Sequence, residues 1–275
     1  MTAKGIVYVN GKFFPAARAA LPVSDLTIQR GYGANDVFRT YNRKPFLLEE
    51  HLKRLKRSTE LMMMRNAPSP QRIKKIVTEG IRRVPGELLI KIIVTGGPSN
   101  HITPLGKPGL LVYFLPFHGH PESHYRKGFR MMTTRALRTL PDAKSIDYFA
   151  AVMAQIRADR TGFDEAIFYD GRRLLEGTTF SIGVIQGRNL IVPKRGTLDG
   201  ITMRAVIRVA PRAGLRVMRR DITFADLKKA DEMISTSTIR EVLSVVCVDK
   251  IKIGAGRPGP YSTRLRAEFQ KYAQK

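Results

Sequence analysis

The stretch LPDAKSIDY, residues 140–148, places a lysine between two segments of different character. Residues 130–134 before it suit a strand, and residues 148–160 after it carry apolar side chains at helical spacing. A side chain at such a strand-to-helix junction can project into a cleft. Lys144 is therefore the first candidate for a chemical role, although most of the many cations of this chain are expected at the surface.

Three segments downstream of this lysine combine turns, hydroxyls and a carboxylate. DGRRLLEGTT, residues 170–179, is a turn followed by Glu176 on a hydroxyl-rich strand. LDGITMR, residues 198–204, puts glycine and threonine at the start of a helix, where free backbone N–H groups and the helix dipole favour phosphate. The hydroxyl cluster STST follows at residues 235–238. The order of these three segments after the lysine segment is a more specific signal of function than any one of the four segments alone.

The N-terminal part is predicted to begin with sheet. Apolar and aromatic residues flank Asn10-Gly11, the strongest short signal for a β-hairpin, so residues 6–9 and 12–14 are expected as its strands. Two amphipathic helices and two buried strands are then predicted from the apolar spacing. They cover residues 49–64 and 70–84 as helices, and 88–94 and 110–114 as strands.

A domain boundary is expected at PFHGHPESH, residues 116–124, because two prolines and a glycine end regular elements. We predict an N-terminal domain at 1–117, a linker at 118–127 and a C-terminal domain at 128–275. The three histidines of this stretch have no cysteine or clear carboxylate at ligand spacing, so a solvated linker is favoured and no metal site is predicted. Strands near 165–169, 180–185 and 189–192 and a helix near 202–213 make the chain α+β.

The composition is that of a globular protein with a sizeable core. The chain has 275 residues, of which 43% are hydrophobic, and a single cysteine, Cys247, which excludes a disulfide within the chain. A reducing setting fits best, and we expect a cytoplasmic protein. No signal-peptide core and no apolar segment of membrane-spanning length is found, so no membrane partner is expected.

The charge balance is the unusual feature of the composition. There are 48 Lys and Arg against 23 Asp and Glu, a formal net charge of +25, which can attract polyanions or small anions. The basic residues are spread along the whole chain and lie beside Leu and Ile at helical spacing, as on the solvated faces of amphipathic helices. This pattern disfavours nucleic-acid binding, which stays a hypothesis.

In their order and spacing, these motifs resemble those of the fold type IV pyridoxal-phosphate enzymes: branched-chain aminotransferases, D-amino-acid aminotransferases and aminodeoxychorismate lyases. The resemblance runs from the Asn10-Gly11 hairpin through Ser24-Asp25 and residues 46–55 to the lysine, glutamate and Gly-Ile-Thr segments, and weakens at residues 256–263. It implies a two-domain α+β fold with a smaller N-terminal α/β domain and a larger C-terminal mixed β domain with flanking helices. It also implies a homodimer and pyridoxal 5′-phosphate as cofactor.

The resemblance assigns a role to individual side chains. Lys144 would carry the cofactor covalently and shuttle the proton of the substrate Cα, and Glu176 would sit against the pyridine nitrogen and keep it protonated. Tyr148 would bond to the phenolic oxygen of the cofactor ring. Arg54 would grip the phosphate through its guanidinium fork. The remaining phosphate ligands would be Ile201, Thr202, Ser237 and Thr238.

Several positions depart from the family pattern. The family often reads Gly-x-Gly-Val-Phe-Glu where residues 34–39 read ANDVFR, while Asp147 and Ser181 replace two usual asparagines. The Arg-x-His pair of the best-known D-amino-acid enzymes is matched by Ser99-Asn100-His101, which lacks the arginine that traps the substrate carboxylate. Arg30 and Lys91, in segments that line the substrate side in this family, are the alternative traps.

We therefore expect an aminotransferase that moves an amino group between an amino acid, branched-chain-like or D, and a 2-oxo acid. The near alternative is an aminodeoxychorismate lyase-type elimination that uses the same lysine. The alternative from another class is a basic nucleic-acid-binding or scaffold protein without the chemistry.

Overall fold

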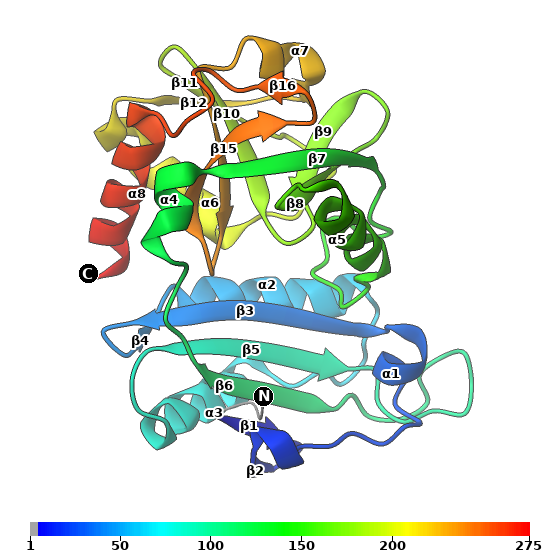
Figure 1. Cartoon of the computed structure of the whole chain (residues 1–275). Coiled ribbons are helices and arrows are strands. Elements are labelled where there is room, and N and C mark those ends of the chain that lie inside the picture. The colour runs from blue at the N-terminus through cyan, green and yellow to red at the C-terminus, as the bar shows by residue number, and fades with distance from the viewer. Residues whose placement is uncertain (1–4) are drawn as a thin grey trace. The chain divides into compact units, whose positions relative to one another are not determined.

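The computed structural model describes residues 5–275, and the chain forms two compact units. The first unit extends to His118 and also contains Asp142–Tyr148, and the second contains Gly119–Pro141 and Phe149–Lys275 (Figure 1). The break after His118 lies beside the boundary expected from sequence, and the expected linker at 118–127 contains the short helix α4 (Glu122–Lys127). The predicted domains were continuous in sequence and put residues 142–148, which contain Lys144, in the C-terminal domain. In the structure this segment packs with the first unit.

The first unit is built on an antiparallel six-stranded sheet in the order β2-β1-β6-β5-β3-β4. Its strands are β1 (Ile6–Val9), β2 (Lys12–Pro15), β3 (Gly33–Tyr41), β4 (Lys44–Pro45), β5 (Leu88–Thr95) and β6 (Leu110–Pro116). The predicted hairpin is confirmed as β1 and β2. Asn10 and Gly11 in its turn both have positive φ, the conformation for which this residue pair is selected.

The helices of this unit are η1 (Ala16–Arg18), α1 (Leu26–Arg30), α2 (Leu48–Leu61) and α3 (Pro70–Arg83). The two long helices confirm the predictions for 49–64 and 70–84 within a few residues. They cover one face of the sheet, where Leu52 and Leu55 of α2 and Val77 of α3 belong to one buried apolar cluster with Phe38 of β3 and Phe114 of β6. The opposite face carries a smaller apolar cluster around Val7, Ile93 and Leu111.

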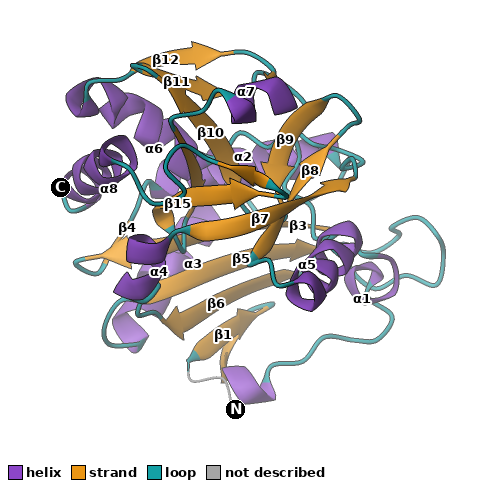
Figure 2. Cartoon of the chain, turned by 45° about the horizontal axis from the view of Figure 1, so that its top comes forward, coloured by secondary structure: helices purple, strands orange, loops and turns teal. Residues whose placement is uncertain are grey.

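The second unit is built on a ten-stranded mixed sheet in the order β12-β11-β10-β14-β15-β7-β8-β9-β13, with β16 paired to β15. Figure 2 shows the neighbouring strands β10, β11 and β12 of this sheet, and β7, β8 and β9. The pairs β11–β12, β15–β7 and β7–β8 are parallel and the others antiparallel. Its strands are β7 (Phe129–Arg135), β8 (Glu165–Tyr169), β9 (Arg173–Gly177), β10 (Ser181–Gln186), β11 (Asn189–Val192), β12 (Arg216–Arg219), β13 (Ile222–Thr223), β14 (Glu232–Ser237), β15 (Glu241–Val248) and β16 (Ile251–Lys252).

Besides α4, the helices of the second unit are α5 (Phe149–Thr161), α6 (Ile201–Val209), η2 (Ala210–Ala213), α7 (Phe224–Lys228) and α8 (Pro260–Ala273). The expected α+β fold with a larger mixed C-terminal sheet and flanking helices is thus confirmed. The helix predicted near 202–213 ends as α at Val209 and continues as a 3₁₀ turn that contains Pro211, which has no N–H to extend the α-helical pattern. No helix within residues 5–275 is long and apolar enough to cross a membrane.

Candidate active site

The backbone around Lys144 is held against the edge of β3. The N–H of Asn35 donates to the Lys144 carbonyl at 2.8 Å, and the N–H of Ile146 donates to the Gly33 carbonyl at 2.9 Å. The side-chain amide of Asn35 also donates to the carbonyl of Ser145 at 2.9 Å. A Cβ on Gly33 would lie 3.0 Å from the Ile146 side chain, so glycine at this position allows the close approach of the two segments. The lysine therefore lies at the predicted junction, with its main chain fixed on both sides.

One buried hydroxyl connects Lys144 with the helix that carries Arg54. The N–H of Lys144 donates to Ser58 Oγ at 2.9 Å, and this hydroxyl donates to the Arg54 carbonyl, also at 2.9 Å. Ser58 is fully buried on α2, one turn after Arg54. The structure thus links two of the predicted residues, which are far apart in sequence, through one short chain of hydrogen bonds.

The guanidinium of Arg54 is held by a buried carboxylate that sequence reasoning missed. Its Nε and Nη2 donate to Asp36 at 2.9 and 2.8 Å, and His51 Nδ1 lies 2.6 Å from the same carboxylate. Asp36 is fully buried. Sequence reasoning treated it only as a departure from a family pattern, although a carboxylate among apolar residues of a strand needs a partner.

The charge state of this cluster follows from its burial and contacts. Burial alone would raise the pKa of Asp36, but Arg54 and His51 outweigh that effect and hold the pKa well below its usual range. Burial lowers the pKa of His51, opposed by Asp36 and supported by the cations Arg54 and Lys144. His51 is therefore neutral at pH 7 and donates from Nδ1 to the Asp36 anion. The cluster fixes both the plane and the position of the Arg54 guanidinium.

The two cations expected to trap a substrate carboxylate lie on different elements of the first unit. Arg30 is the last residue of α1, exposed to solvent, and its guanidinium donates to the carbonyl of Gln29 at 3.0 Å. Lys91 is half-buried on β5, in a cross-strand row with Val37 and Tyr113. Burial raises the pKa of the Tyr113 phenol, so that row combines a cation with a hydroxyl that stays protonated.

Tyr148, the fifth predicted residue of the first unit, is half-buried and directly precedes α5. It ends the segment that begins with the lysine. Its predicted bond to the cofactor ring stays a prediction.

Glu176 lies buried on β9 in the second unit. Arg138 donates to its Oε1 at 3.2 Å, and the N–H of Leu198 donates to its Oε2 at 3.2 Å. Arg138 also donates to the carbonyl of Pro141 at 3.1 Å, which orients its side chain. A carboxylate that accepts from a guanidinium and a peptide N–H is stabilised as the anion. Sequence reasoning did not identify Arg138, because one arginine among so many carries no local signal.

The N-terminus of α6 presents the predicted Ile201 and Thr202. Its N-cap is Gly200, which has no side chain to accept from the first N–H groups of the helix. A Cβ on Gly200 would collide with the Ser181 hydroxyl, so this side chain lies against the start of the helix. Directly opposite Ser181 across β10 and β14 is Thr236, whose buried Oγ1 has no partner among the described residues. The arrangement suits an oxyanion.

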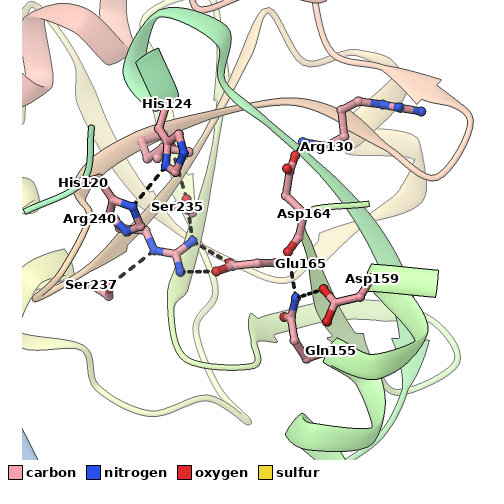
Figure 3. Close-up of polar contacts among 11 residues, drawn as sticks. His120, His124, Arg130, Gln155, Asp159, Asp164, Glu165, Ser235, Ser237 and Arg240 are labelled. Atoms are coloured by element: carbon pink, nitrogen blue, oxygen red, sulfur yellow. Dashed lines mark hydrogen bonds and ion pairs between the residues drawn. The ribbon is translucent and has the colours of Figure 1, made fainter. Parts of the chain in front are cut away.

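The predicted Ser237 and Thr238 end β14 and begin the turn to β15. Ser237 is half-buried, whereas Ser235 and Thr236 before it are buried. The Ser237 hydroxyl accepts from the guanidinium of Arg240 at 3.3 Å (Figure 3). Arg240 was another residue that sequence reasoning did not single out. No cluster of three or more metal-ligating side chains occurs within residues 5–275.

A lysine whose main chain is fixed, a cation-bound carboxylate and an uncapped helix N-terminus beside a buried hydroxyl are groups that suit a pyridoxal-phosphate enzyme. The chain belongs to the class IV amino-transferase family, whose sequence pattern matches residues 33–248. It is therefore an enzyme, an aminotransferase by family, and the resemblance recognised from its motifs is confirmed. The alternative of a non-enzymatic binding protein is not supported.

Individual relatives cover nearly the whole chain. A D-alanine aminotransferase of Bacillus licheniformis is 30% identical over 273 residues, which are 96% of this chain and 95% of that protein. A Methanocaldococcus jannaschii protein, named provisionally as a branched-chain-amino-acid aminotransferase, is 29% identical over 276 residues, with 96% and 95% covered. The solved structure of a T.th. branched-chain amino acid aminotransferase with pyridoxamine 5′-phosphate matches with a TM-score of 0.93 at 26% identity, over 100% of this chain and 95% of that one.

Proposed function

We propose that this chain is a pyridoxal-5′-phosphate-dependent aminotransferase that moves an amino group between an amino acid, branched-chain-like or D, and a 2-oxo acid. The observation that carries the proposal is the buried Glu176 carboxylate, held as an anion by Arg138 and the Leu198 N–H. Such a group suits a protonated pyridine nitrogen. The names of the relatives support both substrate classes, since D-alanine and branched-chain enzymes are similarly close.

The bound cofactor would supply an electron sink that makes the Cα proton of the amino acid acidic. Lys144 would attach the cofactor and then take up and return that proton, with its main chain held by Asn35 and Ser58. Tyr148 would hydrogen-bond the phenolic oxygen of the ring. The hydrogen bonds of the Lys144 main chain restrict the motion of this residue, and such restriction positions a catalytic side chain before substrate arrives.

The phosphate would be taken by neutral donors and one cation. The N–H groups of Ile201 and Thr202 at the uncapped start of α6 fit an oxyanion, as do the hydroxyls of Ser237 and Thr238. Arg54 would contribute a guanidinium whose orientation Asp36 fixes. The buried and unpartnered Thr236 hydroxyl next to this helix terminus supports an anion at this place.

The substrate carboxylate would bind to Lys91 or Arg30. Burying this charge without a cation costs several kcal/mol, so one is required. Lys91 is half-buried opposite Tyr113 on the next strand, whereas Arg30 is exposed but has the better fork for two oxygens. The comparisons name aminotransferases, and no contact among the described residues favours the lyase-type elimination.

A homodimer in the cytoplasm also stays part of the proposal. It rests on the family resemblance and on the single cysteine, and light scattering of the purified protein tests the oligomeric state.

The function is tested by the visible absorbance of the purified protein and by half-reactions with single amino acids. We expect a cofactor band that shifts on addition of D-alanine or of L-leucine, and recovers on addition of a 2-oxo acid. The stereoisomer that shifts the band faster identifies the substrate class. A protein that binds no pyridoxal phosphate, or whose band no D- or L-amino acid shifts, contradicts the proposal.

A further inference from the structure

Arg240 lies in the turn between β14 and β15, yet its guanidinium is buried. Only 3% of the residue is exposed. Both terminal nitrogens donate to the Glu165 carboxylate at the start of β8, each at 2.7 Å (Figure 3). The guanidinium also stacks over the Phe180 ring, 4.2 Å from its centroid. A buried guanidinium in a tight turn is costly unless it is fully paired, so its place between these partners requires a reason.

The remaining N–H groups of Arg240 reach two serines of β14. Nε donates to Ser237 Oγ at 3.3 Å, and Nη1 lies 3.4 Å from Ser235 Oγ. The two hydroxyls then differ. Ser235 donates its own proton to the Leu243 carbonyl at 3.3 Å, whereas no described residue accepts the proton of Ser237. Because the Ser237 oxygen accepts from Arg240, the Ser237 proton points away from the guanidinium and can be donated to another acceptor.

Among residues 5–275, Glu165 is the carboxylate that the Arg240 guanidinium contacts, and the other neighbours of this side chain are hydroxyls and rings. His120 and His124 lie with their Nδ1 atoms 3.1 Å apart, so that one ring donates to the other. Burial, with Arg240 and His124 acting in the same direction and Glu165 opposing them, lowers the pKa of His120. The hydroxyl of Tyr125 donates to the Arg240 carbonyl at 3.1 Å. Because both terminal nitrogens of Arg240 donate to Glu165, the charge of Arg240 is balanced by that carboxylate. The Arg240 guanidinium is thus held in a fixed orientation and is not free to bind a phosphate itself.

We propose that Arg240 is a positioning residue for the phosphate site: paired with Glu165, it holds the Ser237 hydroxyl as an acceptor, so that this hydroxyl presents its proton to the phosphate of the cofactor. The inference rests on the proposed function, in which Ser237 is a phosphate ligand. In this view the Arg240–Glu165 ion pair helps the protein to bind a phosphorylated cofactor in preference to an unphosphorylated one, and does more than stabilise the sheet.

The test compares pyridoxal 5′-phosphate with pyridoxal, which lacks the phosphate. Both are titrated into the cofactor-free full-length protein, and binding is followed by absorbance. Ser237→Ala leaves the Arg240–Glu165 pair intact and removes only the hydroxyl. We expect it to weaken pyridoxal-phosphate binding about tenfold, the effect of one hydrogen bond to a charged group. Pyridoxal binding should stay unchanged.

Arg240→Gln should produce a similar selective loss, and the double variant with Ser237→Ala should lose little more, because both changes remove one interaction. Arg240→Lys keeps a cation for Glu165 but cannot also reach Ser237, so it should show the same loss if Arg240→Gln does not fold. Arg220→Gln is the matched control. It breaks another ion pair of this unit, with Asp226, and should affect both ligands equally or not at all.

A Ser237→Ala protein with an unchanged ratio of the two affinities overturns the inference. So do Arg240 variants that weaken both ligands equally, or losses of the two single variants that simply add. A wild-type protein that binds neither ligand at Lys144 contradicts the proposed function instead, so the two failures are distinguishable.

Discussion

Replacing Asp36 by asparagine tests whether the buried cluster on β3 and α2 is held together by charge. The carboxylate accepts two hydrogen bonds from Arg54 and one from His51, and it is fully buried. Removing one partner of a buried ion pair costs about 3–5 kcal/mol, because the other charge is left uncompensated. The Arg54 side chain keeps 10% exposure, and the asparagine oxygen can still accept one bond. We therefore expect the lower end, about 3 kcal/mol.

The assay is thermal unfolding of the cofactor-free protein, followed by circular dichroism. A loss of 1 kcal/mol lowers the midpoint by about 2–4 °C in a chain of this size, so Asp36→Asn should lower it by about 6–12 °C. Glu79→Gln is the control in the same unit. It removes an ion pair with Arg83 in which both side chains are half-exposed, and such a surface pair contributes at most about 1 kcal/mol.

The destabilisation caused by Asp36→Asn should depend on pH, in a direction that follows from the pKa of Asp36. The pKa of Asp36 is depressed in the folded protein, whereas in the unfolded chain it is about 4. The ionised carboxylate therefore stabilises the folded protein above the unfolded pKa, and this contribution is lost as the pH falls toward the folded pKa. The stability difference between wild type and Asp36→Asn should be complete at neutral pH and shrink in acid. A difference that is small at neutral pH, or that stays constant into acid, would refute the electrostatic reasoning.

The remaining predictions concern the site directly. Lys144→Ala should abolish turnover, and borohydride reduction of the wild type should label Lys144; a reduced adduct on another lysine would exclude it. Glu176→Gln should slow the half-reaction while pyridoxal phosphate stays bound, since its phosphate ligands are untouched; weaker cofactor binding at a normal rate would contradict this division of roles. Arg30→Ala and Lys91→Ala are compared in half-reactions with an unchanged cofactor spectrum. The residue that binds the substrate carboxylate should raise the KM by about ten- to a hundredfold, the effect of losing a charge-assisted pair, and unaltered kinetics in either variant rules that residue out.

The elements that sequence predicted correctly are those whose signals are local. The Asn10-Gly11 turn, the apolar spacing of α2 and α3 and the runs of β5 and β6 each depend on neighbours within a few positions. The strands β3, β14 and β15 were not assigned. In β3 and β14, polar and charged residues such as Asn35, Asp36, Thr236 and Ser237 interrupt the apolar pattern of a buried strand, and these residues lie at the candidate site. In β15 the polar Glu241 and Ser244 interrupt an otherwise apolar run.

The sequence by itself was sufficient for the family, the fold class and the ordered set of lysine, glutamate and phosphate-type motifs, since these are readable as residue types at fixed spacing. The tertiary structure alone decided which partners hold those groups. Ser58 and Lys144 are 86 positions apart, Arg138 and Glu176 38, and Glu165 and Arg240 75. Burial selects such pairs, because a charge or hydroxyl removed from water must find a partner in space, and no local spacing records which of many arginines or serines will be there.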